Sequence, residues 1–383
     1  MSDAKSDPLL IPVLSASNFV IGMGAFLVVG MLTPIATSLD ISAATAGQIM
    51  TVYAIAYAIL SPLLVAMTGA IGRRRVLAAG LCLFALGAAL AAVSSSTLGL
   101  NLSRLFAAAG AGLFTPVAAA TAAGLSSEAT RGRVLAAVFF GLTLAQVVGV
   151  PAGSYIAYTF GWRWAFWLVV ALALPCIALV WMRVPKGLSF QATKLSDLAQ
   201  VMKNGPLMLA ILFTASFLGA IYVVFTYLAP MLEDLMGFGR DGITLALLIF
   251  GAGAVVGNIL GGILADKLGP ARTLLLVAIG QAAIMPAFSF LPMPPWVVFA
   301  IIALWSVVGW SFMASQQSRL IARAPEAASV VLALNAASIY VGAAAGSAAG
   351  GLVLATAGPS GLGVAAGLFM LGAVAHVIAS NRA

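Results

Sequence analysis

The sequence contains very few charged residues. Only 7% of its 383 residues are Asp, Glu, Lys or Arg, whereas 63% are hydrophobic. A soluble domain carries about a quarter charged residues, because its surface faces water. Ten acidic and eighteen basic residues could not cover a globule of this length. Lipid must therefore be the main solvent of the outer surface, and the sequence predicts an integral membrane protein.

Chemically reactive groups are scarce as well. One histidine, two cysteines and ten scattered carboxylates supply neither a metal site nor an acid–base pair. A Gly-Lys-Ser/Thr phosphate-binding loop is also missing. The sequence therefore predicts a protein that is not an enzyme and that needs no cofactor or metal. Cys82 and Cys176 lie inside apolar runs, where we expect small buried or lipid-facing side chains without a disulfide.

The net charge of +8 indicates membrane topology rather than a nucleic-acid partner, because no basic face carries interleaved aromatic residues. If the N-terminus is cytoplasmic, fifteen of the eighteen Lys and Arg fall on the inner side. Arg163 and Arg240 fall on the outer side, and Arg104 falls within a span. Cytoplasmic loops collect such residues, and anionic lipid head groups attract them. We therefore expect an inner-membrane protein with both termini in the cytoplasm.

Long apolar runs are the main positive signal. A helix that crosses the hydrocarbon needs about 20 apolar residues. Breaks at charged or Pro/Gly-rich points leave twelve such runs, near residues 11–37, 45–69, 76–97, 99–124, 133–158, 162–183, 206–232, 242–265, 272–291, 295–318, 328–356 and 361–380. The predicted fold class is therefore an all-α integral membrane protein with twelve transmembrane helices.

The longest loop divides these spans into six and six. Residues 1–183 and 206–383 are the predicted N-terminal and C-terminal bundles, and residues 184–205 are the linker. Within the linker, Ser196-Asp197 precedes apolar residues at helical spacing (Leu198, Val201 and Met202), and Asn204-Gly205 follows them. This pattern predicts a short amphipathic helix on the cytoplasmic surface of the membrane.

The two halves share residues at one offset, which indicates an internal repeat. The pairs, 197 positions apart, are Gly72 and Gly269, Arg75 and Arg272, Gly149 and Gly346, and Gly153 and Gly350. Two six-helix bundles in the same orientation are typical of one large class of transporters.

The loop after the eighth span carries the most specific motif. It reads Gly261-Gly262-Ile263-Leu264-Ala265-Asp266-Lys267-Leu268-Gly269, followed by Arg272. This segment resembles the Gly-x-Leu-x-Asp-Arg/Lys-x-Gly loop of the major facilitator superfamily. The whole chain is similar to its twelve-span drug and metabolite exporters, the drug:proton antiporter-like branch. The resemblance implies the major facilitator fold and a gating role for Asp266, Lys267 and Arg272, whose charges could pair with a neighbouring helix end.

Two further segments resemble gating motifs of this family. The N-terminal copy of the loop keeps Arg73 and Arg74, but Gly69 stands where the family has an acid. These arginines either take part in gating or simply hold the loop in the cytoplasm. The fifth span carries Gly149, Pro151 and Gly153, similar to the exporter-associated motif. Ordinary close helix packing is the alternative explanation for these three residues.

Arg104 is the most informative single residue. It stands about six residues into the predicted fourth span, roughly 9 Å below its outer end. A charge at such depth usually faces a cavity or a partner. Arg104 matches the fourth-span arginine of the family, which implies coupling or substrate binding. The alternative is that its side chain extends to the outer head groups.

Acidic residues are missing where many exporters of this family have one. Gly22-Met23-Gly24 in the first span is followed by Ala25 and Phe26, and no Asp or Glu lies in the middle of any predicted span. The resemblance therefore implies proton coupling, and the lack of an acid in the spans argues against it.

The resemblance implies a substrate pocket near the membrane midplane, lined by spans one, four, seven and ten. The candidates are Asn18, Met23, Phe26, Arg104, Phe114, Phe217, Tyr222, Phe225, Tyr227, Trp305, Trp310 and Gln316. Tyr53, Tyr57, Gln146, Asn258 and Asn335 could add polar contacts. An aromatic pocket with few charges favours a neutral or amphipathic cargo.

The leading hypothesis is a secondary active transporter that exports a drug-like compound or metabolite by alternating access, with protons as the coupling ion. The alternative is a facilitator or uptake system for a sugar, nucleoside or purine. The missing first-span acid favours this alternative, and the fifth-span motif opposes it. The expected partners are the small-molecule substrate and membrane lipids, and the chain is expected to act as a monomer.

Overall fold

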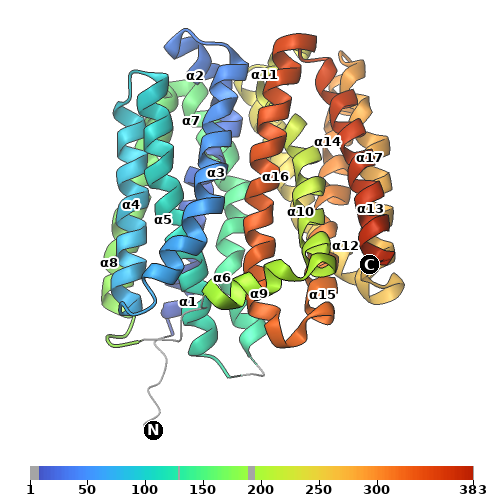
Figure 1. Ribbon diagram of the computed structural model, residues 1–383. Coiled ribbons are helices and arrows are strands. Elements are labelled where there is room, and N and C mark those ends of the chain that lie inside the picture. Colours follow the sequence, from blue (N-terminus) through green and yellow to red (C-terminus); the bar gives the residue numbers. More distant parts are fainter. Residues whose placement is uncertain (1–7, 128–129, 189–194, 383) are drawn as a thin grey trace.

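The computed structural model describes residues 8–127, 130–188 and 195–382, and all regular structure in these ranges is helical (Figure 1). Twelve helical segments are long and apolar enough to cross a membrane. The predicted spans are confirmed, with ends that differ by a few residues. The largest difference is in the tenth span, which continues to Arg323 although the sequence predicts an end near residue 318.

The first six spans form the N-terminal half, and two of them are interrupted. The first span consists of α1, the 3-10 turn η1 and α2, and the fifth consists of α6, the π-turn η2 and α7. The bounds are α1 Leu10–Phe26, η1 Leu27–Met31, α2 Leu32–Leu39, α3 Ala43–Met67, α4 Arg73–Val93, α5 Thr97–Gly124, α6 Arg131–Leu144, η2 Ala145–Gly149, α7 Val150–Phe160 and α8 Trp162–Arg183.

The last six spans form the C-terminal half, in which the seventh, ninth and tenth spans are interrupted. Their bounds are α10 Gly205–Phe225 with α11 Leu228–Met236, α12 Arg240–Leu268, α13 Pro270–Ile284 with η3 Met285–Phe290, α14 Pro295–Trp310 with α15 Phe312–Arg323, α16 Ala328–Ala357 and α17 Gly361–Arg382. A short 3-10 turn, η4 Pro325–Ala327, precedes α16.

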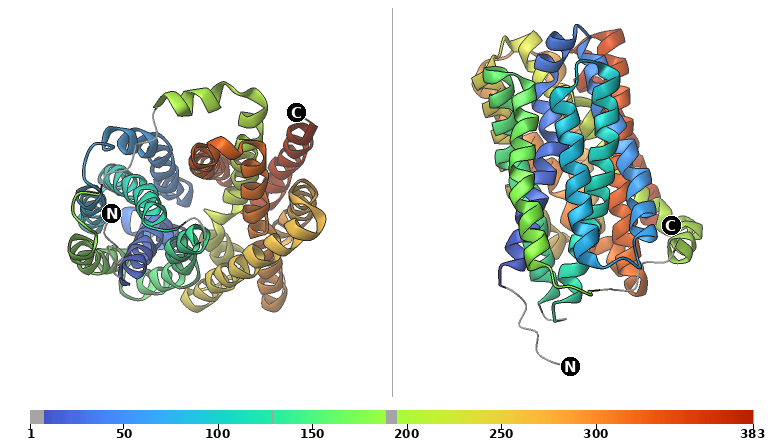
Figure 2. Two further views of the ribbon diagram at one scale, coloured as in Figure 1. Left: turned by 90° about the horizontal axis from the view of Figure 1, so that it is seen from below. Right: turned by 90° about the vertical axis from the view of Figure 1, so that its left-hand side faces the viewer.

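The halves lie side by side when viewed along the helices (Figure 2, left). The predicted linker helix is present as α9, Leu195–Lys203, which runs along one edge of the assembly. Val201 of α9 packs against Leu207, Leu320 and Val331 of the C-terminal half. The side chain of Asn204 accepts a hydrogen bond from the Leu207 N–H and so begins α10. Ser196 and Leu198, also part of the prediction, have side chains outside the described set.

The glycines repeated between the halves allow equivalent close contacts between helices. A Cβ on Gly149 of the fifth span would lie 3.0 Å from Met23 of the first span. A Cβ on Gly346 of the eleventh span would overlap the carbonyl oxygen of Gly219 in the seventh span. In both halves, therefore, a missing side chain lets the corresponding pair of helices approach closely. The repeat predicted from the sequence therefore corresponds to the same helix–helix packing in both halves.

We name the two ends of the bundle by their charges. The basic end carries Arg73, Arg131, Arg183, Arg272 and Arg323 at helix termini, and it lies at the bottom of Figure 1. The distal end, at the top, carries the loops near Asp40, Arg163, Glu233 and Arg240. The predicted alternation of basic and less basic loops is therefore present in the fold.

Candidate functional site

Arg104 is the most deeply placed charged side chain in the described spans. It is the eighth residue of α5, about 10 Å from the first residue of that helix at 1.5 Å per residue, and it is 1% exposed. Its Nη1 and Nη2 donate to the carbonyl oxygens of Gly24 and Ala25 at 3.0 and 2.9 Å. The guanidinium thus caps the negative end of the α1 dipole. It does not extend to the outer head groups, which rules out the alternative explanation.

Tyr53 connects Arg104 to the other half. The Cζ atom of Arg104 lies 4.4 Å from the centroid of the Tyr53 ring, a cation–π contact. The Tyr53 ring meets Tyr340 of α16 edge-on at 6.2 Å, and Tyr57, one turn further along α3, stacks on Tyr340 at 3.6 Å. The hydroxyl of Tyr53 is buried and has no hydrogen-bond partner in the described part of the chain. Spans two, four and eleven therefore meet around one cation and three rings.

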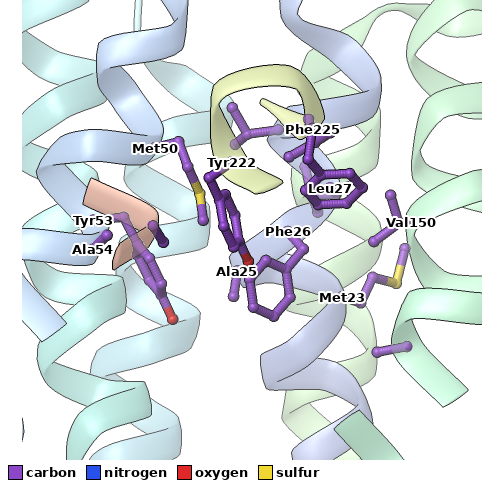
Figure 3. Close-up of a cluster of buried hydrophobic side chains, with 14 of the residues drawn as sticks. Met23, Ala25, Phe26, Leu27, Met50, Tyr53, Ala54, Val150, Tyr222 and Phe225 are labelled. Carbon is purple, nitrogen blue, oxygen red and sulfur yellow. The ribbon is translucent and has the colours of Figure 1, made fainter. Parts of the chain in front are cut away.

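The first and seventh spans add two more rings beside these. Figure 3 shows Tyr222 of α10 lying between Tyr53 and Phe26. Phe26 is the last residue of α1, where the 3-10 turn begins, and is 9% exposed. Phe225 continues the row into the C-terminal half, where it stacks on Phe250 at 4.4 Å. We call Phe26, Tyr53, Tyr57, Tyr222 and Tyr340 the central aromatic cluster.

Tyr227 closes the distal end by shape. Its ring lies directly on Gly47 of α3, so that a Cβ on Gly47 would overlap both ring and hydroxyl. The hydroxyl donates to the carbonyl oxygen of Ser347 at 2.8 Å, and a Cβ on Gly351 would lie 2.6 Å from it. Tyr227 was predicted to line a pocket at the midplane. This is corrected, because the ring occupies a socket formed by glycines of both halves at the distal end.

Polar contacts join the halves at the same end. The Tyr158 hydroxyl of α7 donates to Oε2 of Glu233 in α11 at 3.2 Å. The guanidinium of Arg240 lies 4.6 Å from the Tyr155 ring centroid and forms an ion pair with Asp241 at 2.7 Å. These contacts link the fifth span to the seventh and eighth spans across the boundary between the halves.

The π-turn of the fifth span provides a further contact between the halves. Pro151 has no N–H to donate into the preceding turn, and the wider turn at Ala145–Gly149 precedes it. This turn brings its backbone against the eighth span, where a Cβ on Gly251 would lie 2.6 Å from the carbonyl oxygen of Gln146. The Gly/Pro segment predicted for gating thus adjoins a close approach between halves, while Gly149 and Gly153 pack on the first span.

The charged loop motif lies open at the basic end. Asp266, Lys267 and Arg272 are exposed and form no ion pair with the residues that the structure describes. Gly269 ends α12 with φ +80°, a conformation that favours glycine. In the N-terminal copy, Arg74 lies over the Trp181 ring at 4.3 Å. Arg73 is buried, and its main-chain N–H donates a hydrogen bond to the carbonyl oxygen of Leu188 in the linker.

Most of the other predicted substrate contacts lie inside one half. Asn18 donates to the Val138 oxygen at 3.0 Å, and Gln316 donates to the Ala210 oxygen at 2.8 Å. The predicted residues whose described contacts lie within their own half are Asn18, Met23 and Phe114 in the N-terminal half, and Phe217, Trp305, Trp310 and Gln316 in the C-terminal half. The spacing of residues along a helix could not predict which side chains face the interior of one half and which face the other half. Phe26, Arg104, Tyr222 and Phe225 remain at the centre.

Two central or distal residues were missed from the sequence. Tyr340 is the only aromatic residue of α16, and its isolation in a run of small residues was the available signal. Gly47 offered no signal, because only its distance from Tyr227 distinguishes it from other glycines. The single histidine, His376, lies within the C-terminal half, where its ring nitrogens bond to Ser216 Oγ and the Leu209 oxygen at 2.7 and 2.8 Å.

A hollow of about 410 Å³ lies on the flank of the C-terminal half, lined by residues of α10, α16 and α17 such as Ser216, Gly219 and Phe369. None of the predicted substrate contacts lines it. The aromatic boundary between the halves, rather than this hollow, is therefore the candidate site.

Comparison with known proteins identifies the family. The profile of the Major Facilitator Superfamily matches residues 14–347. The chain belongs to this superfamily. It is 31% identical to the MFS-type transporter YtbD of Bacillus subtilis, over 97% of this chain and 94% of the relative. It is 30% identical to a chloramphenicol resistance protein of Streptomyces lividans, over 88% of this chain and 87% of the relative.

A solved structure has the same fold as this superfamily member. It is the crystal structure of a bacterial homologue of the human lysosomal transporter Spinster, in an inward-facing and unoccupied conformation. The TM-score is 0.74 at 16% identity, covering 100% of this chain and 96% of that chain. The predicted major facilitator fold, two six-helix bundles, is confirmed.

Proposed function

We propose that this superfamily member exports a small neutral or amphipathic molecule, a drug-like compound or metabolite, across the inner membrane by alternating access. The basic end faces the cytoplasm in this proposal, and a proton gradient drives the export. The observation that carries it is the closed distal boundary, where Tyr227 fills the socket at Gly47. A cargo bound at the central aromatic cluster would reach the far side only after this contact separates.

The distal contacts are suited to repeated opening. Tyr227 bonds within its own half, to Ser347, and meets Gly47 by shape alone. The polar contact between Tyr158 and Glu233 is a single hydrogen bond. Separating such surfaces costs little compared with unfolding either half, so the two bundles can move as bodies.

The cargo class is supported by the chemistry of the central aromatic cluster. It offers rings from both halves and a single cation, Arg104, a composition that favours a largely apolar molecule. Similarity to a protein named for chloramphenicol resistance is consistent with a drug-like cargo. Support for proton coupling is the resemblance to drug:proton antiporters, with Glu233 as the carboxylate at the boundary between the halves.

Purified protein in liposomes tests the proposal. A thermal-shift screen of drugs, nucleosides and sugars selects a ligand, and its uptake is then followed under an imposed pH gradient. We expect accumulation against the concentration gradient that an uncoupler abolishes. Exchange that ignores every pH gradient would remove the antiport step, and the absence of any exchange would remove transport.

Arg104→Ala tests the role of the central cation. We expect transport to be lost with normal membrane expression, because the carbonyl groups of Gly24 and Ala25 lose their cap. Arg163→Ala is the matched control: Arg163 also lies over a ring, Trp162 at 4.2 Å, and donates to a carbonyl oxygen, but at the distal surface. Equal transport by both variants would contradict the assigned role of Arg104.

Facilitated diffusion is the second candidate, favoured by one observation. No carboxylate of the described spans lies deeper than four residues from a span end, so a proton path through the centre lacks an acid. Under this alternative, the cargo would equilibrate without accumulating, and an uncoupler would change nothing.

A further inference from the structure

The charge at the centre of the protein has no counter-charge among the described residues. Every described charged residue other than Arg104 lies within four residues of the end of its span or outside the spans. Arg104 is 1% exposed and forms no ion pair with any described carboxylate. A buried cation in a membrane span is costly, and such residues usually pair with another group. The carbonyl oxygens of Gly24 and Ala25 supply only partial negative charge.

Two donor atoms at this place have no hydrogen-bond partner among the residues that the structure describes. Nη1 and Nη2 of Arg104 each have a carbonyl partner, but Nε is buried without one. The hydroxyl of Tyr53, whose ring lies under the guanidinium, is also buried without a partner. An arginine N–H can only donate, and a phenol can donate. Two free donors beside a positive charge call for an acceptor, and an anionic acceptor makes the strongest hydrogen bonds.

Aromatic side chains from both halves surround these donors. Tyr57 and Tyr340 stack on each other next to Tyr53, and Figure 3 shows Tyr222 lying between Tyr53 and Phe26. An aromatic body can pack between such rings in offset or edge-on geometry. The surroundings therefore suit a molecule with a planar apolar body and one polar head.

From this geometry we propose that the cargo is an aromatic monoanion, such as an aromatic carboxylate, whose head group accepts hydrogen bonds from Arg104 Nε and the Tyr53 hydroxyl. The proposal rests on the proposed transport function and narrows its amphipathic cargo to one charge type. The four neighbouring rings hold the body of the cargo between the halves.

Binding to detergent-purified protein tests the charge preference directly. The probes are mono- and bicyclic aromatic carboxylates, each with its neutral carboxamide and its cationic aminomethyl analogue of the same ring. Binding is measured by calorimetry and thermal shift. We expect at least one carboxylate to bind about ten-fold or more tightly than its amide, which is the effect of a hydrogen bond to a charged group, and the amine not to bind.

Tyr53→Phe tests the assigned donor without removing the ring. We expect this variant to lose about ten-fold of carboxylate affinity and to bind the amide as the unmodified protein does. Tyr155→Phe is the matched control, because Tyr155 also lies under an arginine, Arg240, but at the distal surface. Arg104→Gln should abolish the preference for the carboxylate. If that variant fails to fold, the Tyr53→Phe comparison still decides.

The outcomes separate this inference from the proposed function. Equal or tighter binding of the amides, binding of the amines, or no binding of any carboxylate in the set would overturn the anion assignment. Transport of a neutral compound in liposomes would then leave the proposed export intact. Carboxylate binding with unchanged affinity in Tyr53→Phe would overturn the role of that hydroxyl. Carboxylate binding without transport of any probe would instead contradict the proposed function.

Discussion

The two ends of this protein are built differently. At the distal end, Tyr227 fits onto Gly47 across the boundary between the halves, and an uncharged hydrogen-bond donor, Tyr158, meets Glu233. At the basic end, the charged motif residues Asp266 and Lys267 are exposed and form no described ion pair. One end is closed by shape, and in the proposed function the charges at the other end pair when that end closes. Alternating access would then exchange steric contacts for electrostatic ones.

The largest expected effect comes from filling the socket at the distal end. Gly47→Ala places a Cβ where the Tyr227 ring lies. Overpacking of this kind costs about 1–3 kcal/mol, so the distal end should stay open and transport should fall about ten-fold or more. The measurement is uptake in liposomes, together with thiol labelling of a cysteine placed at the distal boundary.

Two further variants make this test specific. Gly372→Ala on α17 is the control, since a Cβ there meets nothing within 4 Å, and it should transport normally. Combining Gly47→Ala with Tyr227→Leu should restore part of the activity, because the smaller side chain leaves room for the new methyl group. Normal transport by Gly47→Ala alone would contradict closure by shape.

An intermediate effect is expected at the basic end. Asp266→Asn should lower transport several-fold, because the motif loses the charge that pairs when this end closes. The melting temperature should stay unchanged, since Asp266 is exposed in this state and surface substitutions usually change stability by less than about 0.5 kcal/mol. Asp241→Asn is the control: its carboxylate belongs to an exposed ion pair at the distal end. A drop in melting temperature without a transport defect would show that Asp266 stabilises this state instead.

The smallest effect is expected from the polar distal contact. Tyr158→Phe removes one hydrogen bond to Glu233, for which a net contribution of about 0.5–1.5 kcal/mol is typical. Transport should change about two- to five-fold, less than with Gly47→Ala. In a double-mutant cycle with Glu233→Ala the two effects should not add. Additive effects would mean that the hydrogen bond does not form during transport.

Much of the fold could be predicted from local chemistry. Apolar length predicts each span because the hydrocarbon has a fixed thickness, and the spacing of Gly342, Gly346 and Gly350 predicts a helix face for close packing. The structure bears this out, as each glycine faces a main-chain oxygen of α10. The fifth span is interrupted just before Pro151, whose missing N–H has a local consequence.

The candidate site was less predictable. Phe217 and Phe225 both lie in α10, yet Phe217 stacks on Phe312 inside the half while Phe225 lies beside the boundary. Both sequence contexts are uniformly apolar, so helical periodicity gives no face preference there. Arg104 was found because a charge in a span is rare, whereas its carbonyl partners depend on where α1 ends.

The sequence by itself determined that lipid surrounds this protein, that it has twelve membrane spans, and how basic residues are distributed between its two ends. These properties follow from hydropathy and charge, which each residue carries regardless of its neighbours. Only the tertiary structure decided that Tyr227 meets Gly47, that Tyr57 stacks on Tyr340, and that Arg104 Nε lies beside Tyr53 without a described partner. Such contacts join residues that are distant in the chain, and they depend on how closely the helices approach one another.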